Sequence, residues 1–98
     1  YSPGHKLHLG NLKELAAQFS NNNKLGVLSF SGSGLSGHPE AILSPSGNLS
    51  EAAKNLFGHL RLLDSYDVDM IIAEKVPDTG LGRAINDRLE RASVRITC

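Results

Sequence analysis

The chain has 98 residues and a formal net charge of zero, so it can form one small domain and lacks the basic excess typical of proteins that grip nucleic acid. Hydrophobic residues make up 40% of it, but three phenylalanines, two tyrosines and no tryptophan leave an aliphatic core. No apolar run approaches the roughly 20 residues of a membrane span, so we expect no membrane association. The single cysteine, Cys98, cannot form an internal disulfide, which fits a cytoplasmic protein.

The first part of the chain predicts two strands around a short helix. Alternating leucines indicate a strand over residues 5–9. Asn11 is a good N-cap for a helix over residues 12–19, because its side chain can accept a hydrogen bond from a backbone amide of the first turn. The asparagine-rich residues 20–23 favour a turn, and residues 25–30 then predict a second strand.

The middle of the chain predicts a loop, a short strand and a long helix. Residues 31–37, SGSGLSG, are interpreted as a loop. A third strand is expected at 40–43, and a turn follows at 44–48. Ser50 is the expected N-cap of a helix over 51–65. The stripe of this helix that we expect to be buried contains Ala53, Leu56, Phe57, Leu60 and Leu63.

Residues 68–73 form a nearly continuous apolar run, which is typical of a strand covered on both faces in a parallel sheet. Pro77 cannot continue this strand, because it lacks the backbone donor. Gly80 and Gly82 permit a sharp turn into a helix that starts at Leu81, and we expect a positive φ at one glycine and a close backbone approach at the other. The expected buried stripe of this helix contains Leu81, Ile85, Leu89 and Ala92. The residues expected on its other sides are Arg83, Asn86, Asp87, Glu90 and Arg91.

The predicted elements follow the order β-α-β-β-α-β-α, and residues 94–97 add a last edge strand or a tail. Alternating strands and helices favour an α/β fold with a mostly parallel sheet of four to five strands and helices on both faces. Residues 1–4 contain a proline and a glycine and are interpreted as a turn or linker remnant. Residues 5–98 are interpreted as a single α/β domain.

Two glycine motifs are compared with known ligand sites. The spacing of Gly32, Gly34 and Gly37 matches the dinucleotide-binding fingerprint, but no helix follows the third glycine to face a pyrophosphate. We therefore favour a flexible surface loop. Gly80 and Gly82 do open a helix whose amides could hold an anion. The interpretation that they only shape the turn is favoured.

Other polar groups do not form a convincing catalytic or metal-binding set. Glu74 lies where a receiver domain has its phosphoacceptor, but it is not an aspartate and the acidic pair that binds magnesium is missing. Clustered aspartates are interpreted as a solvated helix end, and the histidines as scattered surface residues. These residues are Asp64, Asp67 and Asp69, and His5, His8, His38 and His59. We expect no catalytic residue and no metal site.

Two segments resemble a known family. Residues 77–89, PDTGLGRAINDRL, resemble the signature P-x-x-G-L-G-x-A-[hydrophobic]-x-[D/N]-R-L near the end of the L-threonylcarbamoyladenylate (threonylcarbamoyl-AMP) synthases, the two-domain members of the YrdC/Sua family. Residues 55–64, NLFGHLRLLD, resemble the same family's L-F-x-x-L-R-x-L-D helix. Upstream of Ser50 the match is weak, although Tyr1, Ser2 and Pro3 resemble the end of the family's interdomain linker motif. The main signature positions are Pro77, Gly80, Leu81, Gly82, Ala84, Arg88 and Leu89.

The resemblance implies a Rossmann-like three-layer α/β/α fold and the position of a C-terminal domain. The parent enzyme of this family is a nucleotidyltransferase that makes threonylcarbamoyl-AMP from L-threonine, bicarbonate and ATP, for the N6-threonylcarbamoyladenosine modification of tRNA. Its ATP and magnesium, and its catalytic residues, are expected in an N-terminal YrdC-like domain that this chain lacks and that would be its partner. The C-terminal domain is thought to position the linker over the active site, and only Tyr1 falls in a motif implicated in covering the nucleotide.

Two hypotheses result. The first is a non-catalytic accessory or regulatory domain, inactive alone, in a cytoplasmic, translation-factor-like protein of tRNA processing. An RNA contact of the full-length protein would use the arginines of the last helix and its tail, although a salt-bridged, solvated face is the commoner arrangement. The second hypothesis is a free-standing α/β domain that binds a small ligand or nucleotide near residues 31–37 and 77–82, beyond the strand ends.

Overall fold

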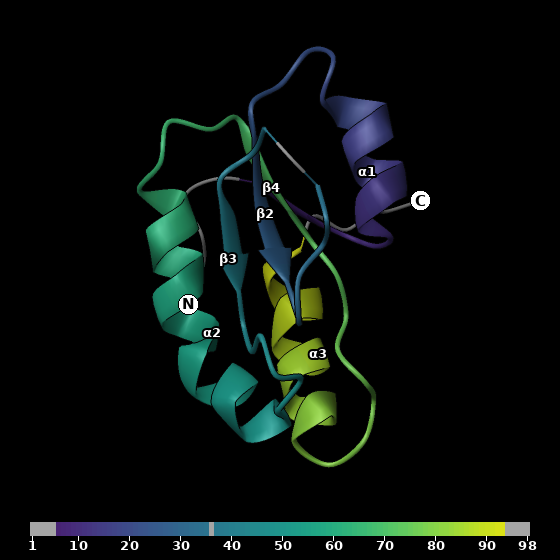
Figure 1. Cartoon of the computed structure of the whole chain (residues 1–98), viewed down its shortest axis with the longest axis vertical. Coiled ribbons are helices and arrows are strands. Elements are labelled where there is room, and N and C mark those ends of the chain that lie inside the picture. The colour runs from purple at the N-terminus through teal and green to yellow at the C-terminus, as the bar shows by residue number, and fades with distance from the viewer. Residues whose placement is uncertain (1–5, 36, 94–98) are drawn as a thin grey trace.

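The computed structural model describes residues 6–35 and 37–93, and its centre is a parallel sheet of four strands (Figure 1). The strands lie in the order β1-β4-β2-β3, which confirms the mostly parallel sheet predicted from the sequence. Their bounds are Lys6–Leu9 for β1, Leu25–Ser29 for β2, Glu40–Ile42 for β3 and Met70–Ala73 for β4.

Helices cover both faces of the sheet, as predicted. Helix α1 (Leu12–Phe19) lies on one face, and α2 (Leu49–Asp64) and α3 (Leu81–Ala92) pack together on the other (Figure 1). Helix α1 leads from β1 past β4 to β2, whereas α2 leads from β3 back past β2 to β4. Since parallel crossovers are right-handed, these opposite directions place the two helices on opposite faces. The result is a Rossmann-like three-layer α/β/α domain.

Strand β4 lies in the interior of the sheet, between β1 and β2. Its apolar run is buried on both faces, because Ile72 packs in the cluster beneath α1 while Ile71 and Ala73 pack in the cluster beneath α2 and α3. All three side chains are fully buried. The two-sided burial explains why the sequence here is continuously apolar instead of alternating. The strand begins at Met70, slightly later than the run predicted.

The connection from β2 to β3 contains no helix, although the two strands are parallel. Residues 30–35 leave the carboxyl end of β2, and residues 37–39 lead into the amino end of β3 (Figure 1). Leu35 packs against the apolar cluster on the α1 face. This loop therefore covers part of the face that a crossover helix usually covers.

Three predictions about the helices are wrong. The N-cap of α2 is Asn48 instead of Ser50, and the helix begins at Leu49. Leu81, predicted to be buried, is 50% exposed at the first position of α3. Asn86, predicted on the solvent side, is only 5% exposed.

Among the helices of the described residues, none combines the length and apolarity that crossing a bilayer requires.

The predicted last strand or tail at residues 94–97 lies outside the described residues. Ser93, the last residue described, forms an isolated parallel bridge with Leu7 of β1. The chain thus leaves α3 and reaches the edge of the sheet next to β1.

The N-cap assignment gives a direct prediction. The Asn48 side-chain oxygen accepts a hydrogen bond of 3.0 Å from the Glu51 backbone amide. The backbone amide of Asn48 donates to Ser44 Oγ at 2.7 Å. Asn48→Ala should lower the free energy of unfolding by about 1 kcal/mol. Ser50→Ala is the matched control and should change it by less than about 0.5 kcal/mol. Urea denaturation of both variants measures this, and equal losses would contradict the assignment.

Candidate functional site

The carboxyl edge of the sheet is the usual place of ligand binding in an open α/β sheet. The segments that follow β2, β3 and β4 meet at this edge, which lies at the lower end of the strands in Figure 1. In residues 6–35 and 37–93, every buried side-chain nitrogen or oxygen has a hydrogen-bond partner. The buried polar side chains of this edge are therefore bound within the protein.

The turn between β4 and α3 requires both of its glycines, for different reasons. Gly80 has φ 53°, a conformation that a side chain makes costly. Gly82 is buried, and a Cβ placed on it would overlap the backbone carbonyl oxygen of Pro77. Its lack of a side chain lets α3 approach the preceding turn closely. The positive φ and the close approach expected from the sequence are both present.

The first amides of α3 already have partners within the turn. Gly82 N donates to the Thr79 carbonyl oxygen at 2.8 Å, and Arg83 N donates to the Gly80 carbonyl oxygen at 3.2 Å. An anion bound at this helix start would compete with those carbonyls for the same hydrogen atoms. The geometry favours the interpretation in which the glycines shape the turn.

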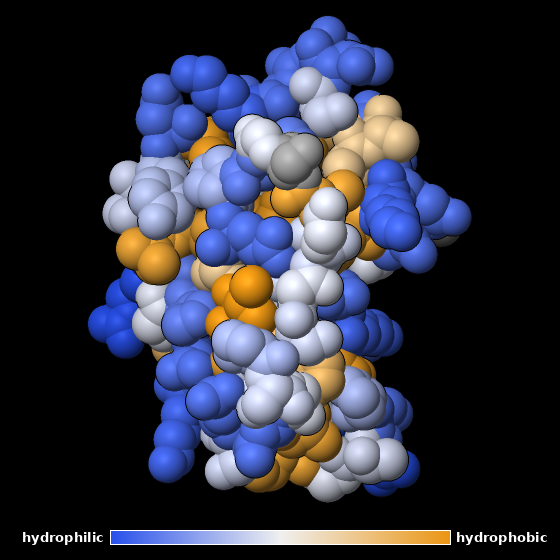
Figure 2. All heavy atoms as spheres, viewed as in Figure 1, coloured by the Kyte–Doolittle hydropathy of each residue, from blue (hydrophilic) through white to orange (hydrophobic). Residues whose placement is uncertain are grey.

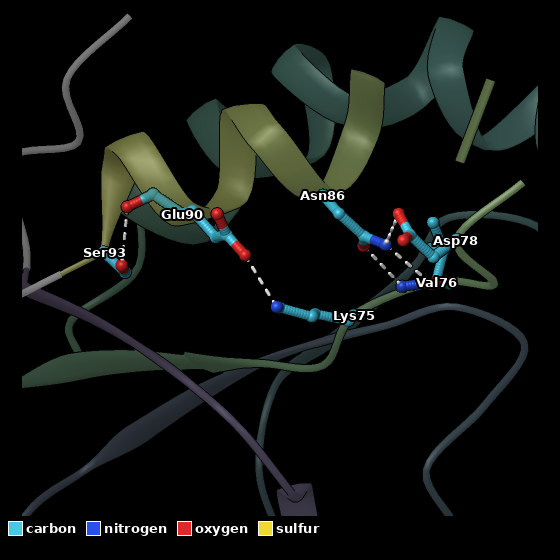
Figure 3. Close-up of polar contacts among 6 residues, drawn as sticks. All are labelled: Lys75, Val76, Asp78, Asn86, Glu90 and Ser93. Atoms are coloured by element: carbon cyan, nitrogen blue, oxygen red, sulfur yellow. Dashed lines mark hydrogen bonds and ion pairs between the residues drawn. The ribbon is translucent and has the colours of Figure 1, made fainter. Parts of the chain in front are cut away.

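Asn86 fastens α3 to the turn (Figure 3). Its Oδ1 accepts from the Val76 backbone amide and its Nδ2 donates to the Val76 carbonyl oxygen, both at 2.8 Å. A contact of 3.5 Å from Nδ2 to Asp78 Oδ1 is too long to add much. The sequence offered a signal that was missed, because Gly82, Asn86 and Leu89 share one helical face.

Two carboxylates near the turn also serve the fold. Glu74 accepts a hydrogen bond of 2.9 Å from the backbone amide of Phe30, which ties the end of β4 to the end of β2. Glu90 of α3 pairs with Lys75 at 2.6 Å (Figure 3). The hydrogen bond and the charge of Glu90 raise the pKa of Lys75, but both groups are about half exposed and the pair contributes little to stability.

The glycine-rich loop after β2 surrounds a carboxylate of the protein itself. Glu40 accepts hydrogen bonds from Ser29 Oγ at 2.6 Å, and from the amide and hydroxyl of Ser33 at 2.9 Å each. Gly32, Gly34 and Gly37 all have positive φ, which lets the loop fold back around this group. The Ser33 amide, the kind of donor that holds phosphate in a nucleotide-binding loop, is therefore occupied by Glu40.

These hydrogen bonds determine the ionisation of Glu40. Partial burial alone would raise the pKa of its carboxyl, because the charged form loses water. The bonds from Ser29 and Ser33 outweigh that effect and lower the pKa below its ordinary value of 4.5. Nothing in the sequence pattern indicated this role, because Glu40 simply opens a short strand.

The clustered aspartates and the histidines do not form a shared site in the described residues. Asp67 pairs with Lys24 Nζ at 3.2 Å, and Asp69 accepts from the Lys24 amide at 2.7 Å. No group of three or more potential metal ligands occurs in the described part of the chain. His8 packs on the ring of Phe19, whereas Tyr1 and His5 lie outside the described residues.

The signature positions of the last helix divide between core and surface. Gly82 and Leu89 are buried, whereas Ala84 and Arg88 are exposed like Leu81 and Pro77. The Arg88 guanidinium lies 5.1 Å from the centre of the Phe57 ring of α2. Arg88 thus helps to join the two helices on their outer side.

Comparisons with known proteins agree with this structure. Residues 1–94 match the family described as threonylcarbamoyl-AMP synthase, C-terminal domain. The threonylcarbamoyl-AMP synthase of Pyrococcus abyssi is 40% identical over 83 residues, which are 84% of this chain and 23% of that protein. The crystal structure of P. abyssi Sua5 complexed with L-threonine has a TM-score of 0.78 at 32% identity, over 95% of this chain and 29% of that one. The C-terminal Sua5 domain of a hypothetical Pyrococcus horikoshii Sua5 protein has a TM-score of 0.68 at 31% identity, over 91% of this chain and 93% of that one.

The fold and its internally paired carboxyl edge define a Rossmann-like α/β domain whose buried polar groups, in the described residues, maintain its own structure. The chain belongs to the threonylcarbamoyl-AMP synthase family, in which it corresponds to the C-terminal domain. It spans about a quarter of the length of the full-length relatives that it matches.

The turn geometry predicts a graded loss of stability. Gly80→Ala should lower the free energy of unfolding by roughly 1–2 kcal/mol, because a Cβ is strained at positive φ. Gly82→Ala should cost about 3 kcal/mol or more, since α3 must move away from the Pro77 carbonyl. Chemical denaturation of each variant gives these values.

Asp78→Ala is the control for the turn. Asp78 is exposed, and its 3.5 Å contact with Asn86 is weak. The substitution should therefore change the free energy of unfolding by less than about 0.5 kcal/mol. If both glycine variants unfold like the parent chain, the turn is neither strained nor tightly packed. The anion-site interpretation of the helix start would then become the better one.

The Glu40 hydrogen bonds predict a dependence of stability on pH. Because the pKa of Glu40 is lowered in the folded state, its contribution is complete above the unfolded value of 4.5 and is lost as the pH falls through the lower folded pKa. At pH 7, Glu40→Gln should lower the free energy of unfolding by about 1–2 kcal/mol. Urea denaturation from pH 7 to pH 3 should show the difference between parent and variant shrinking on the acid side. A difference that stays constant with pH would contradict the charged role.

Proposed function

We propose that this chain is a non-catalytic accessory domain of a full-length threonylcarbamoyl-AMP synthase. One observation carries the proposal: the chain matches the C-terminal domain of the family, and the buried polar groups of its described carboxyl edge are paired within the domain. A catalytic site needs polar groups that are available to substrate. Here the glycine-rich loop binds the Glu40 carboxylate instead. The first amides of α3 donate to the carbonyl groups of Thr79 and Gly80.

In the proposed full-length protein, the preceding YrdC-like domain is the catalytic partner. It binds ATP and magnesium and forms threonylcarbamoyl-AMP from L-threonine and bicarbonate in the cytoplasm, for the modification of tRNA. The domain described here acts on that reaction indirectly, by positioning the linker that contains Tyr1 over the active site. The P. abyssi relative complexed with L-threonine supports the substrate class.

An RNA contact of the full-length protein is a secondary part of the proposal. It would involve the exposed arginines on the outer side of α3. Arg91 is already paired with Asp87 at 3.1 Å, and Arg88 lies over Phe57, so this face carries less available charge than its sequence suggests. A tRNA contact through α3 alone should be weak and sensitive to salt.

The proposal predicts a division of activity between the two parts. The 98-residue chain alone should release no pyrophosphate from ATP in the presence of threonine and bicarbonate, whereas the full-length protein should. Deleting residues 6–98 from the full-length protein should lower the rate roughly tenfold or more, because the covering linker loses its anchor and water reaches the nucleotide. A pyrophosphate-release assay on the three proteins measures this.

Two outcomes would contradict the proposal. Pyrophosphate release by the 98-residue chain would show that it is itself catalytic. Saturable micromolar binding of ATP, NAD or threonine, with amide shifts confined to residues 31–37 and 77–82, would favour the free-standing ligand-binding domain.

A further inference from the structure

The amino edge of the sheet, opposite the edge described above, contains an open hollow of about 490 Å³. Three connections frame it: the one from α1 to β2, the one from α2 to β4, and the last residues of the loop before β3. Figure 1 shows these connections meeting at the upper end of the sheet. None of the interactions that hold the carboxyl edge together uses this hollow.

Buried apolar residues line the hollow together with polar ones, which include Ser20, Asn23 and His38. Leu25 and Val68 line it and are almost fully buried, and Tyr66, also in its lining, is 40% exposed. The exposed ion pair between Lys24 and Asp67 lies on its rim. In Figure 2 the upper end of the molecule is mainly hydrophilic, and hydrophobic residues form smaller separate patches below it. An apolar centre with a polar rim is the composition of a protein contact surface.

Exposed apolar side chains also gather at this edge. Leu62 is 46% exposed and precedes Tyr66 by four residues, near the end of α2. The only other large hydrophobic residue of comparable exposure in the described chain is Leu81, which lies at the start of α3. Tyr66, which follows the end of α2 and lines the hollow, is therefore the exposed apolar residue that another protein segment can cover there.

The electrostatics of the hollow disfavour an anionic ligand such as a nucleotide. Helices α1 and α2 both end here, with Ser20 and Ser65 as their C-caps, so their partial negative ends face this edge. Asp67 adds a full negative charge on the rim, although Lys24 pairs with it. A phosphate-bearing ligand would prefer a helix amino end. The hollow fits an apolar side chain of a protein better.

The position of β1 indicates which protein segment lies within reach. Lys6 begins β1 and pairs with Met70, whose other neighbour is Leu25, a residue of the hollow. Two strand spacings of about 4.8 Å therefore separate the start of β1 from the hollow. This chain matches 23% of the P. abyssi relative, and β1, the first strand described, begins at the amino edge.

We propose that the amino edge of the sheet is the docking surface for the domain that precedes β1 in the full-length protein, and that an apolar side chain of that domain fills the hollow against Leu25 and Tyr66. The inference rests on the proposed function for the existence of that domain. Contacts between domains of one chain are usually modest in area, and tethering raises their effective concentration. The contact therefore has to be tested in the intact protein.

The test compares full-length variants that differ at matched exposed positions. Tyr66→Glu places a charge in the hollow, and Leu81→Glu places the same charge on a similarly exposed residue at the other end of the sheet. Hydrogen exchange is measured in residues 20–25 and 37–39 and in the preceding domain. Tyr66→Glu should speed exchange at the contact roughly tenfold, as expected for loss of a central aromatic contact, and Leu81→Glu should leave it unchanged.

Tyr66→Ala, which removes the ring without adding a charge, is a second variant, in case Tyr66→Glu alters folding, and circular dichroism checks both. It should speed exchange at the same segments. The proposal is overturned if neither variant at the amino edge changes exchange in the preceding domain, or if Leu81→Glu is the variant that does. Pyrophosphate release by the unsubstituted full-length protein is measured in the same samples. If the full-length protein is active but hydrogen exchange is not slowed at the amino edge, the docking surface alone is rejected. If exchange is slowed there but the full-length protein releases no pyrophosphate, the proposed function alone is rejected.

Discussion

The close approach of α3 to the turn that precedes it is the constraint on which the C-terminal half of the structure depends. At Gly82 the helix lies against the Pro77 carbonyl with no room for a Cβ, and Asn86, one turn later, binds both backbone polar groups of Val76. Ile85 and Leu89 are thereby directed into the core shared with α2. Because α2 packs against α3 over this cluster, the position of α3 on the turn determines how α2 covers the sheet.

The same arrangement explains why the carboxyl edge differs from that of a ligand-binding Rossmann-like domain. Such domains bind ligands with a glycine-rich loop and a helix amino end. This chain has both features, but Glu40 occupies the loop and the carbonyl groups of Thr79 and Gly80 occupy the helix start. The likeness in sequence therefore reflects shared backbone requirements, positive φ and close packing, more than a shared ligand.

The sequence predicted the parallel sheet, the layers and the turn because those depend on local apolar patterns and on glycine. It did not predict Asn48 as the cap of α2, because Ser50 is an equally good cap by residue type and only the backbone after Gly47 decides between them. Asn86 was placed on the wrong side because a polar residue in an amphipathic helix is usually exposed. Its burial depends on the backbone amide and carbonyl of Val76, which hydrogen-bond to its side chain across ten residues, a pairing visible only in three dimensions. The hollow was missed for the same reason, since its walls come from three separate connections.

The two edges of the sheet thus have different physical characters. At the carboxyl edge, the buried side-chain donors and acceptors of the described residues have partners within the domain. At the amino edge, two helices present their carboxyl ends, and the exposed Tyr66 lines a hollow. A domain that serves a longer chain needs a surface near its point of attachment, because tethering makes even a modest contact there effective.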